Sequence, residues 1–301
     1  MVEVDTQVIG KAGVIEGLRV DDFVVKDRGK PVTLRYCAQD DLPLDLVLLF
    51  ELTRDMAPRH NNLILAAEMA MAELREGDRV VVLSYNDQVH VELPLTADLK
   101  EMRRRLRLGL LNATFVRRPF ILPTVEASVK YLPPQTEQRR QRAILMFTGD
   151  AGYALKDQNP IAVSKDFWEA DVMLSAFVIP TTLTKITHDD NPFHAHALAM
   201  LGFSLFDYAD DVADQTGGEM VYAGDAGSVH HDPNPNFALR RAVQRMRRRY
   251  KLYYDMPPGK QGQRRRIEVE LSPAAQALHP DAKLFRRRGY VVPKPVRPEQ
   301  R

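Results

Sequence analysis

Two short, densely apolar runs constrain the fold of this chain more than any other feature. They occupy residues 44–50 and 143–147, and each is too apolar for a strand that has one face in solvent. Runs of this kind are typical of central strands covered on both faces of a sheet. Each run ends in polar residues, and if the two strands are parallel neighbours these residues meet at one rim, where open α/β sheets bind ligands. The residues are Glu51, Thr53, Asp55, Thr148 and Asp150.

Strand-like and helix-like segments alternate around these runs. Further buried strands are predicted at 79–85, 172–179 and 219–223, and an alternating edge strand at 89–93. Apolar residues recur at helical spacing in six segments: 58–74, 97–111, 124–132, 160–170, 194–214 and 237–249. This rhythm predicts an α/β fold with a doubly wound, mostly parallel, Rossmann-like sheet.

The two ends of the chain read as β structure. Five segments near the ends have strand-like patterns, with no helix expected between the last three: 2–9, 23–36, 250–254, 266–271 and 283–286. We therefore expect a small antiparallel β domain, of β-sandwich type, built from residues 1–38 and 250–293. The α/β domain, residues 39–249, is inserted into it. Residues 294–301 are expected to be a disordered tail.

The charge distribution is uneven although the formal net charge is only +2. Arginines crowd the segments 240–249, 264–266 and 286–288. We interpret them as a solvated basic surface, with a phosphate or acidic-partner surface as the alternative. Basic residues alone do not specify nucleic-acid binding, so no nucleic-acid partner is expected.

Composition limits other classes of function. Cys37 is the only cysteine, which excludes an intrachain disulfide and Cys-based zinc motifs. Residues 1–9 lack the basic start and apolar core of a signal peptide. No apolar run approaches the roughly 18 residues of a membrane span. The histidines between 188 and 196 and at 230–231 have no recognised zinc-ligand spacing, so they read as solvated loop residues.

Four motifs occur in a fixed order along the chain: Gly17 to Pro31, Glu51-Leu52-Thr53-Arg54-Asp55, Ala213 to Ala223, and Arg287-Arg288-Gly289-Tyr290. The second is similar to the Asp-x-Ser-x-Ser motif that opens the metal-ion-dependent adhesion site of von Willebrand factor type A (VWFA) domains. The other three resemble segments of the VWFA-related proteins first recognised in Acidobacteria. The resemblance spans nearly the whole chain.

The resemblance implies a divalent-cation site at the rim, and the ligands carried over are Glu51, Thr53, Asp55, Thr114 and Asp150. The chain departs from the family pattern at several of these positions. Glu51 replaces the first Asp, Asp55 stands where a hydroxyl belongs, and the family's Thr-Asp-Gly order is changed to Thr148-Gly149-Asp150. The later-loop threonine could be Thr114 or Thr124, and the register of residues 126–127 would instead place Leu122 there.

These departures leave two interpretations of the rim. In the first, which we prefer, binding at the rim is independent of metal or has been lost. In the second, the site is rewired for Mg²⁺, Ca²⁺ or Mn²⁺ through Glu51, Asp55 and Asp150.

The function expected is a non-catalytic protein-interaction module of the adhesion or scaffold type with a degenerate metal site. No nucleophile stands in a catalytic signature, and no glycine-rich phosphate loop follows the first apolar run. One alternative is a metal-dependent hydrolytic enzyme on the same rim, with Asp55 as its nearby base. Another is a structural subunit with a vestigial rim that assembles through the apolar 194–214 helix. Because many relatives are exported, the resemblance implies an extracytoplasmic location with the leader absent from this sequence, and a cytoplasmic one otherwise.

Overall fold

The structure is a computed structural model that describes residues 1–39, 42–54, 56–86, 88–111, 114–115, 121–134, 139–149, 160–179, 208–222 and 235–293. Two of the predicted rim residues, Asp55 and Asp150, lie outside the described residues. So do the first part of the predicted 194–214 helix, the histidines between 188 and 196 and at 230–231, and the predicted tail 294–301.

Six strands form the central sheet in the order β11-β10-β9-β6-β7-β8. Their bounds are β6 Leu44–Glu51, β7 Arg79–Tyr85, β8 Val89–Thr96, β9 Gln141–Gly149, β10 Met173–Ile179 and β11 Met220–Tyr222. Every neighbouring pair is parallel except β7 and β8, which are antiparallel. The sheet is therefore mixed, with its antiparallel strand at one edge.

The two apolar runs lie side by side in the middle of this sheet. Strand β6 pairs with β9 in a register that runs from Leu44 opposite Gln141 to Phe50 opposite Phe147. The rings of Phe50 and Phe147 stack with their centroids 4.4 Å apart. All residues of both strands are buried. The predicted adjacency of the two runs is confirmed.

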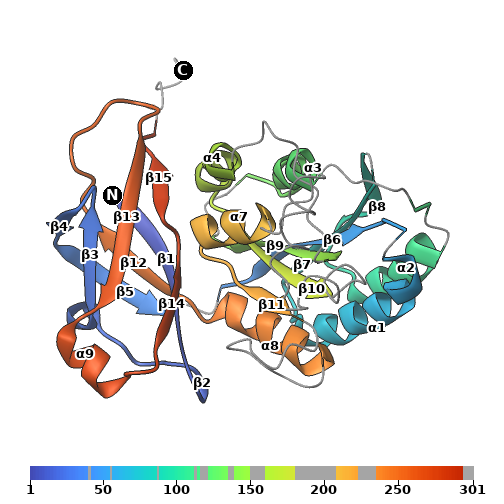
Figure 1. Ribbon diagram of the computed structural model, residues 1–301, viewed down its shortest axis with the longest axis horizontal. Helices are drawn as coiled ribbons and strands as arrows, with labels where there is room; N and C mark the ends of the chain where they lie inside the picture. The colour runs from blue at the N-terminus through green and yellow to red at the C-terminus, as the bar shows by residue number, and fades with distance from the viewer. Residues whose placement is uncertain are drawn as a thin grey trace, which may run out of the picture.

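Helices cover both faces of the sheet (Figure 1). Leu46, Leu48 and Phe50 of β6 belong to one core cluster with residues of α1 (His60–Ala70), α2 (Leu99–Leu111) and α8 (Pro235–Arg247), which we call the α1 layer. Val47 and Leu49 belong to a second cluster with α3 (Ile121–Ser128), α4 (Pro160–Ala170) and α7 (Tyr208–Thr216), the α4 layer. Alternate residues of a strand point to opposite faces, so one strand supplies both cores.

The ends of the chain form two antiparallel sheets, which we call the β part (left in Figure 1). The first has the order β14-β1-β12-β5, with β2 paired to β1, and the second has the order β15-β13-β3-β4. The strands are β1 Val2–Gly10, β2 Gly13–Val14, β3 Phe23–Asp27, β4 Lys30–Val32, β5 Leu34–Gln39, β12 Tyr250–Tyr254, β13 Arg264–Leu271, β14 Lys283–Arg286 and β15 Gly289–Val291. Apolar side chains of both sheets share one core cluster.

Two local features of the β part differ from expectation. The predicted 23–36 hairpin turns at Arg28 and Gly29, both with positive φ, but it pairs only as far as Val32. Strand β5 then joins the other sheet and pairs with β12. A short helix, α9 (Pro273–Leu278), lies between β13 and β14, so the expectation of no helix there is wrong. Ser272 caps this helix by accepting a hydrogen bond from the Ala275 N–H, and Pro273 suits its first turn.

Several arginines that we expected in solvent are buried. Arg245, Arg247, Arg249 and Arg265 are each at most 7% exposed. Arg245 pairs with Glu219 at 2.8 Å, and Arg247 donates to Asp78 at 2.9 Å. The interpretation as a solvated surface is therefore wrong for these four arginines. Their carboxylate and carbonyl partners are brought to them only by folding, so the sequence pattern does not reveal them.

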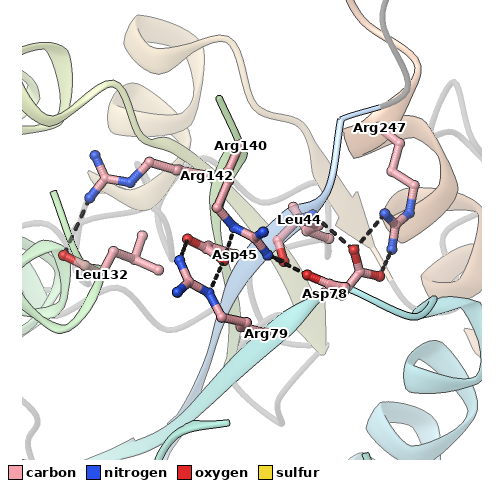
Figure 2. Close-up of polar contacts among 9 residues, drawn as sticks. Leu44, Asp45, Asp78, Arg79, Leu132, Arg140, Arg142 and Arg247 are labelled. Atoms are coloured by element: carbon pink, nitrogen blue, oxygen red, sulfur yellow. Dashed lines mark hydrogen bonds and ion pairs between the residues drawn. The ribbon is translucent and has the colours of Figure 1, made fainter. Parts of the chain in front are cut away.

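Ion pairs also tie together the amino edge of the central sheet, as Figure 2 shows. Asp45, at the start of β6, accepts two hydrogen bonds from Arg79 and one from Arg140. Asp78 accepts from the Leu44 N–H at 2.8 Å and from Arg247. The starts of β6, β7 and β9 are thereby held to the end of α8.

The β part packs against this same amino edge. Gln141, the first residue of β9, donates to Asp5 of β1 at 3.1 Å, and the Gln7 amide donates to the Arg245 carbonyl at 2.8 Å. Thr216, at the end of α7, forms an isolated antiparallel bridge with Arg287, beside β15. The carboxyl edge of the sheet, at the other end of the strands, carries the polar residues described next.

Candidate functional site

Glu51, the last residue of β6, is the centre of a polar cluster at the carboxyl edge of the sheet. Its Oε1 accepts a hydrogen bond from the Thr53 hydroxyl at 2.7 Å. Its Oε2 accepts from the Thr148 hydroxyl at 2.5 Å, from the Gly149 N–H at 2.8 Å and from the Tyr85 hydroxyl at 3.3 Å. We call these five residues the rim cluster.

Sheet register explains why these residues meet. Glu51 lies opposite Tyr85 of β7, and Phe50 lies opposite Phe147 of β9, so the ends of three parallel strands are level. After Glu51 the backbone turns, with the Met56 and Ala57 N–H groups both donating to the Thr53 carbonyl. This turn keeps Thr53 beside the strand end, where its hydroxyl reaches Glu51.

The rim cluster is buried and electrically neutral apart from Glu51 itself. Glu51 is 3% exposed, and Thr53 and Thr148 are each 1% exposed. Burial raises the pKa of Glu51, and the hydrogen bonds from Thr148, Gly149, Thr53 and Tyr85 offset that rise only in part. The carboxyl group therefore holds its proton more tightly than an ordinary glutamate.

The structure brings together two of the predicted site residues, Glu51 and Thr53. Thr114 is exposed, and it is not among the described hydrogen-bond partners of Glu51. Thr124 is 3% exposed in α3. Asp55 and Asp150 lie outside the described residues, so their position relative to Glu51 stays a prediction.

Sequence reasoning placed Thr148 at the rim but did not find Tyr85 or the Gly149 N–H. The signal for Tyr85 was present, because it ends the strand predicted next along the chain at 79–85. A side chain at the end of a neighbouring parallel strand belongs to the same edge as Glu51. A backbone N–H donor such as that of Gly149 has no signature in the sequence.

The described rim cluster does not by itself suit a divalent cation. Magnesium and calcium take oxygen ligands, with carboxylates prominent among them. Here one carboxyl group is present, and both of its oxygens already accept hydrogen bonds from protein groups. Among the described residues no group of three His, Cys, Asp or Glu side chains is placed to hold a metal. A cation site would therefore depend on Asp55 and Asp150.

In the part of the chain that the structure describes, residues that follow β6 and β7 lie next to the rim cluster. Arg54 and Gln88 are exposed there. The Asn86 side chain accepts from the Gln88 N–H at 3.1 Å and lies 3.0 Å from the His90 ring nitrogen. These contacts link Asn86, after β7, to Gln88 and to His90 of β8.

No protein-family model matches the chain, and no curated protein matches it. Solved structures do match it. Proximal thread matrix protein 1 (PTMP1) from the mussel byssus has a TM-score of 0.50 at 10% identity, over 73% of this chain and 50% of PTMP1. The chain thus spans about half the length of PTMP1. A second PTMP1 structure, with a zinc-occupied MIDAS motif, has a TM-score of 0.47 at 12% identity, over 72% of this chain and 49% of that one.

A von Willebrand factor type A protein from Catenulispora acidiphila also matches, with a TM-score of 0.45 at 11% identity, over 97% of this chain and 74% of that chain. At such identities a match concerns the fold alone. The sheet order and the two helix layers give this chain a layered α/β fold, which it shares with PTMP1. Among the described helices none is both long and apolar enough to cross a membrane.

Proposed function

We propose that the chain is a non-catalytic protein-interaction module of the VWFA type, and that its partner binds at the rim without a bridging cation. The observation that carries this proposal is the closure of Glu51 by Thr53, Thr148, Gly149 and Tyr85. Both oxygens of this carboxyl group accept hydrogen bonds from protein groups, so the group stabilises the rim and is a poor ligand for a cation. The site is in this sense degenerate.

A binding role is favoured over catalysis by the burial of the chemically capable groups. The hydroxyls of Thr53 and Thr148 donate to Glu51, an arrangement that could activate a nucleophile. Both residues are 1% exposed, so both hydroxyls are buried in the rim cluster. The groups that a partner can touch are those of the surrounding loops, such as Arg54 and Gln88.

The position of the β part also favours the carboxyl edge of the sheet as the partner surface. The β part packs on the amino edge through Asp5, Gln7 and Arg287. The architecture we propose is a doubly wound α/β domain, inserted in a small β domain, that turns its carboxyl edge to the partner. An extracytoplasmic location stays a prediction.

The test compares two charge reversals at opposite ends of the same sheet. Arg54→Glu alters the rim surface, and Glu76→Arg alters an exposed residue before β7 at the amino edge. Partners captured from the native source by the unaltered chain are purified and titrated calorimetrically. We expect Arg54→Glu to weaken binding about tenfold or more, because charge complementarity contributes to such contacts, and Glu76→Arg to leave it unchanged.

Chelation separates the two interpretations of the rim. With excess EDTA the affinity is expected to stay the same. Loss of binding in EDTA would show that the partner needs a cation. Equal affinities for Arg54→Glu and the unaltered chain would remove the rim from the interface.

A further inference from the structure

The two helix layers carry opposite charge. In the α1 layer, α2 has Lys100, Arg103, Arg104 and Arg105 exposed. Exposed Arg248, which follows α8, pairs with Glu16 of the β part at 3.0 Å. The nearby carboxylates already have several partners. Glu101 accepts from both Arg104 and Arg105, at 2.7 and 2.8 Å, and Glu73 accepts from Arg240 and Gln244, each at 2.6 Å. The outer face of this layer is therefore basic.

A large apolar side chain stands within this basic face. Leu65 of α1 is 54% exposed. Helix α1 packs against α8 on one side and α2 on the other (Figure 1). Leu65 thus stands on a helix between two helices, of which α2 carries exposed charges, and an apolar centre with a charged rim is typical of protein-binding surfaces.

The outer face of the α4 layer is acidic. Exposed or half-buried carboxylates include Glu126, Asp166, Asp210, Asp211 and Asp214. Burial and the neighbouring carboxylates Asp211 and Asp214 raise the pKa of Asp210. Burial and a hydrogen bond with Asp166 raise the pKa of Glu126. Asp214 also pairs with Arg288. Like charges still crowd one another at Asp210 with Asp211 and at Glu126 with Asp166, and an opposing basic surface would relieve them.

We propose that the α1 layer of one copy, with Leu65 at its centre, docks on the α4 layer of a second copy. The two surfaces lie on opposite faces of the same sheet, as the two core clusters beneath them show. Contact between unlike surfaces is heterologous, so each added copy leaves one basic and one acidic face open. The result is a stack of copies that grows with protein concentration and shortens with salt. The rim lies at the sheet edge, outside this contact, so stacking and partner binding at the rim are separate properties.

Sedimentation velocity over a range of protein concentrations, at low and high salt, tests the stack. One variant weakens the basic face, Leu65→Ser with Lys100→Gln and Arg103→Gln. A second weakens the acidic face, Asp210→Asn with Asp211→Asn. A control, Lys260→Gln with Lys283→Gln, also removes two positive charges, but from exposed positions of the β part. Far-UV circular dichroism establishes that each variant is folded.

The unaltered chain and the control are expected to exceed the mass of a dimer at low salt and to be monomers at high salt. The self-association of each face variant alone should be weakened by about tenfold or more. An equal mixture of the two should form a dimer and nothing larger, because one intact basic face meets one intact acidic face.

Three results would overturn the proposal. The unaltered chain could stay monomeric at low salt at every concentration, which would leave the basic face to an unrelated acidic partner. It could form only a closed dimer, or the mixed variants could fail to associate.

Discussion

Glu51 is the residue that holds the rim cluster together. It accepts hydrogen bonds from four groups, which favour its ionised form, but burial outweighs them and raises its pKa, and it has no described cationic partner. Glutamine has the same shape as a protonated glutamate, with an oxygen for the Gly149 N–H and an amide that can donate to the Thr53 hydroxyl. We expect Glu51→Gln to change the free energy of unfolding by less than about 1 kcal/mol.

Glu51→Ala is the contrasting variant. It leaves the Gly149 N–H without an acceptor and opens a cavity, so a loss of about 2–4 kcal/mol is expected in denaturant unfolding at neutral pH. If glutamine proved as damaging as alanine, the site would require an ionised carboxylate.

The rim also shows what residue patterns can and cannot predict. Glu51 and Thr53 could be placed at the edge because a strand end is visible as the point where an apolar run meets polar residues. Tyr85 ends a predicted strand and carries the same signal, whereas the contact of the Gly149 N–H depends on the register between strands, which no single strand encodes. The buried arginines Arg247 and Arg249 read as surface residues because their partners, Asp78 and Asp5, are distant in sequence.

At the scale of elements, Asp78 fastens the start of β7 to the start of β6 and the end of α8. Burial raises its pKa, but hydrogen bonds from Arg247 and from the Arg75 and Leu44 N–H groups outweigh that effect, so the pKa is lowered. A carboxyl group with a lowered folded-state pKa stabilises the fold above its unfolded pKa of about 3.9 and loses that contribution as pH falls through the folded value.

Asp78→Asn should therefore cost about 3–5 kcal/mol near neutral pH, because Arg247 is left buried without its countercharge. The variant should also lose less stability than the unaltered chain when the pH is lowered from about 4. Denaturant unfolding measured across pH tests both effects. Asp255→Asn is the control, since its pair with Arg35 is about two-thirds exposed and is worth less than about 1 kcal/mol. Equal losses for the two variants would contradict a structural role for the amino edge.

The elements themselves differ in how far sequence predicts them. The central strands and the flanking helices were predictable because burial on two faces, or on one stripe, leaves a periodic pattern. Strand β5 was not predictable as a separate strand, because β4 and β5 follow each other in sequence and read as one arm of a hairpin. Only the pairing of β5 with β12 shows that it belongs to the other sheet. Helix α9 has six residues and depends on the Ser272 cap more than on periodicity.

At the scale of the whole molecule, two of the motifs that suggested the family lie against each other. Arg288, in the Arg287-Arg288-Gly289-Tyr290 motif, donates its N–H to the Gln215 carbonyl at 3.0 Å. Arg287 pairs with Asp171 at 2.9 Å, and the Trp168 indole N–H donates to the same Gln215 carbonyl at 2.9 Å. Segments near residues 213–219 and 287–290, weak as separate signals, thus form one junction between the α/β and β parts.

Gly289 makes this junction testable. A Cβ added there would lie 2.6 Å from the Trp168 ring and 2.7 Å from the Arg265 carbonyl oxygen. Gly289→Ala should lower the free energy of unfolding by about 1–3 kcal/mol and shift the fluorescence of Trp168, the single tryptophan. Gly10→Ala, whose Cβ would lie 3.3 Å from the flexible Ile15 side chain, should have little effect. An unchanged spectrum for Gly289→Ala would mean that the junction is looser than described.

With the β part on the amino edge, we propose that a partner binds the carboxyl edge of the sheet and that this binding needs no cation. Calorimetric titration of Mg²⁺, Ca²⁺ and Mn²⁺ into chelator-treated protein tests this claim most directly, with Glu51→Gln measured alongside. No saturable heat is expected for either protein. Saturable binding by the unaltered chain that Glu51→Gln abolishes would contradict the account.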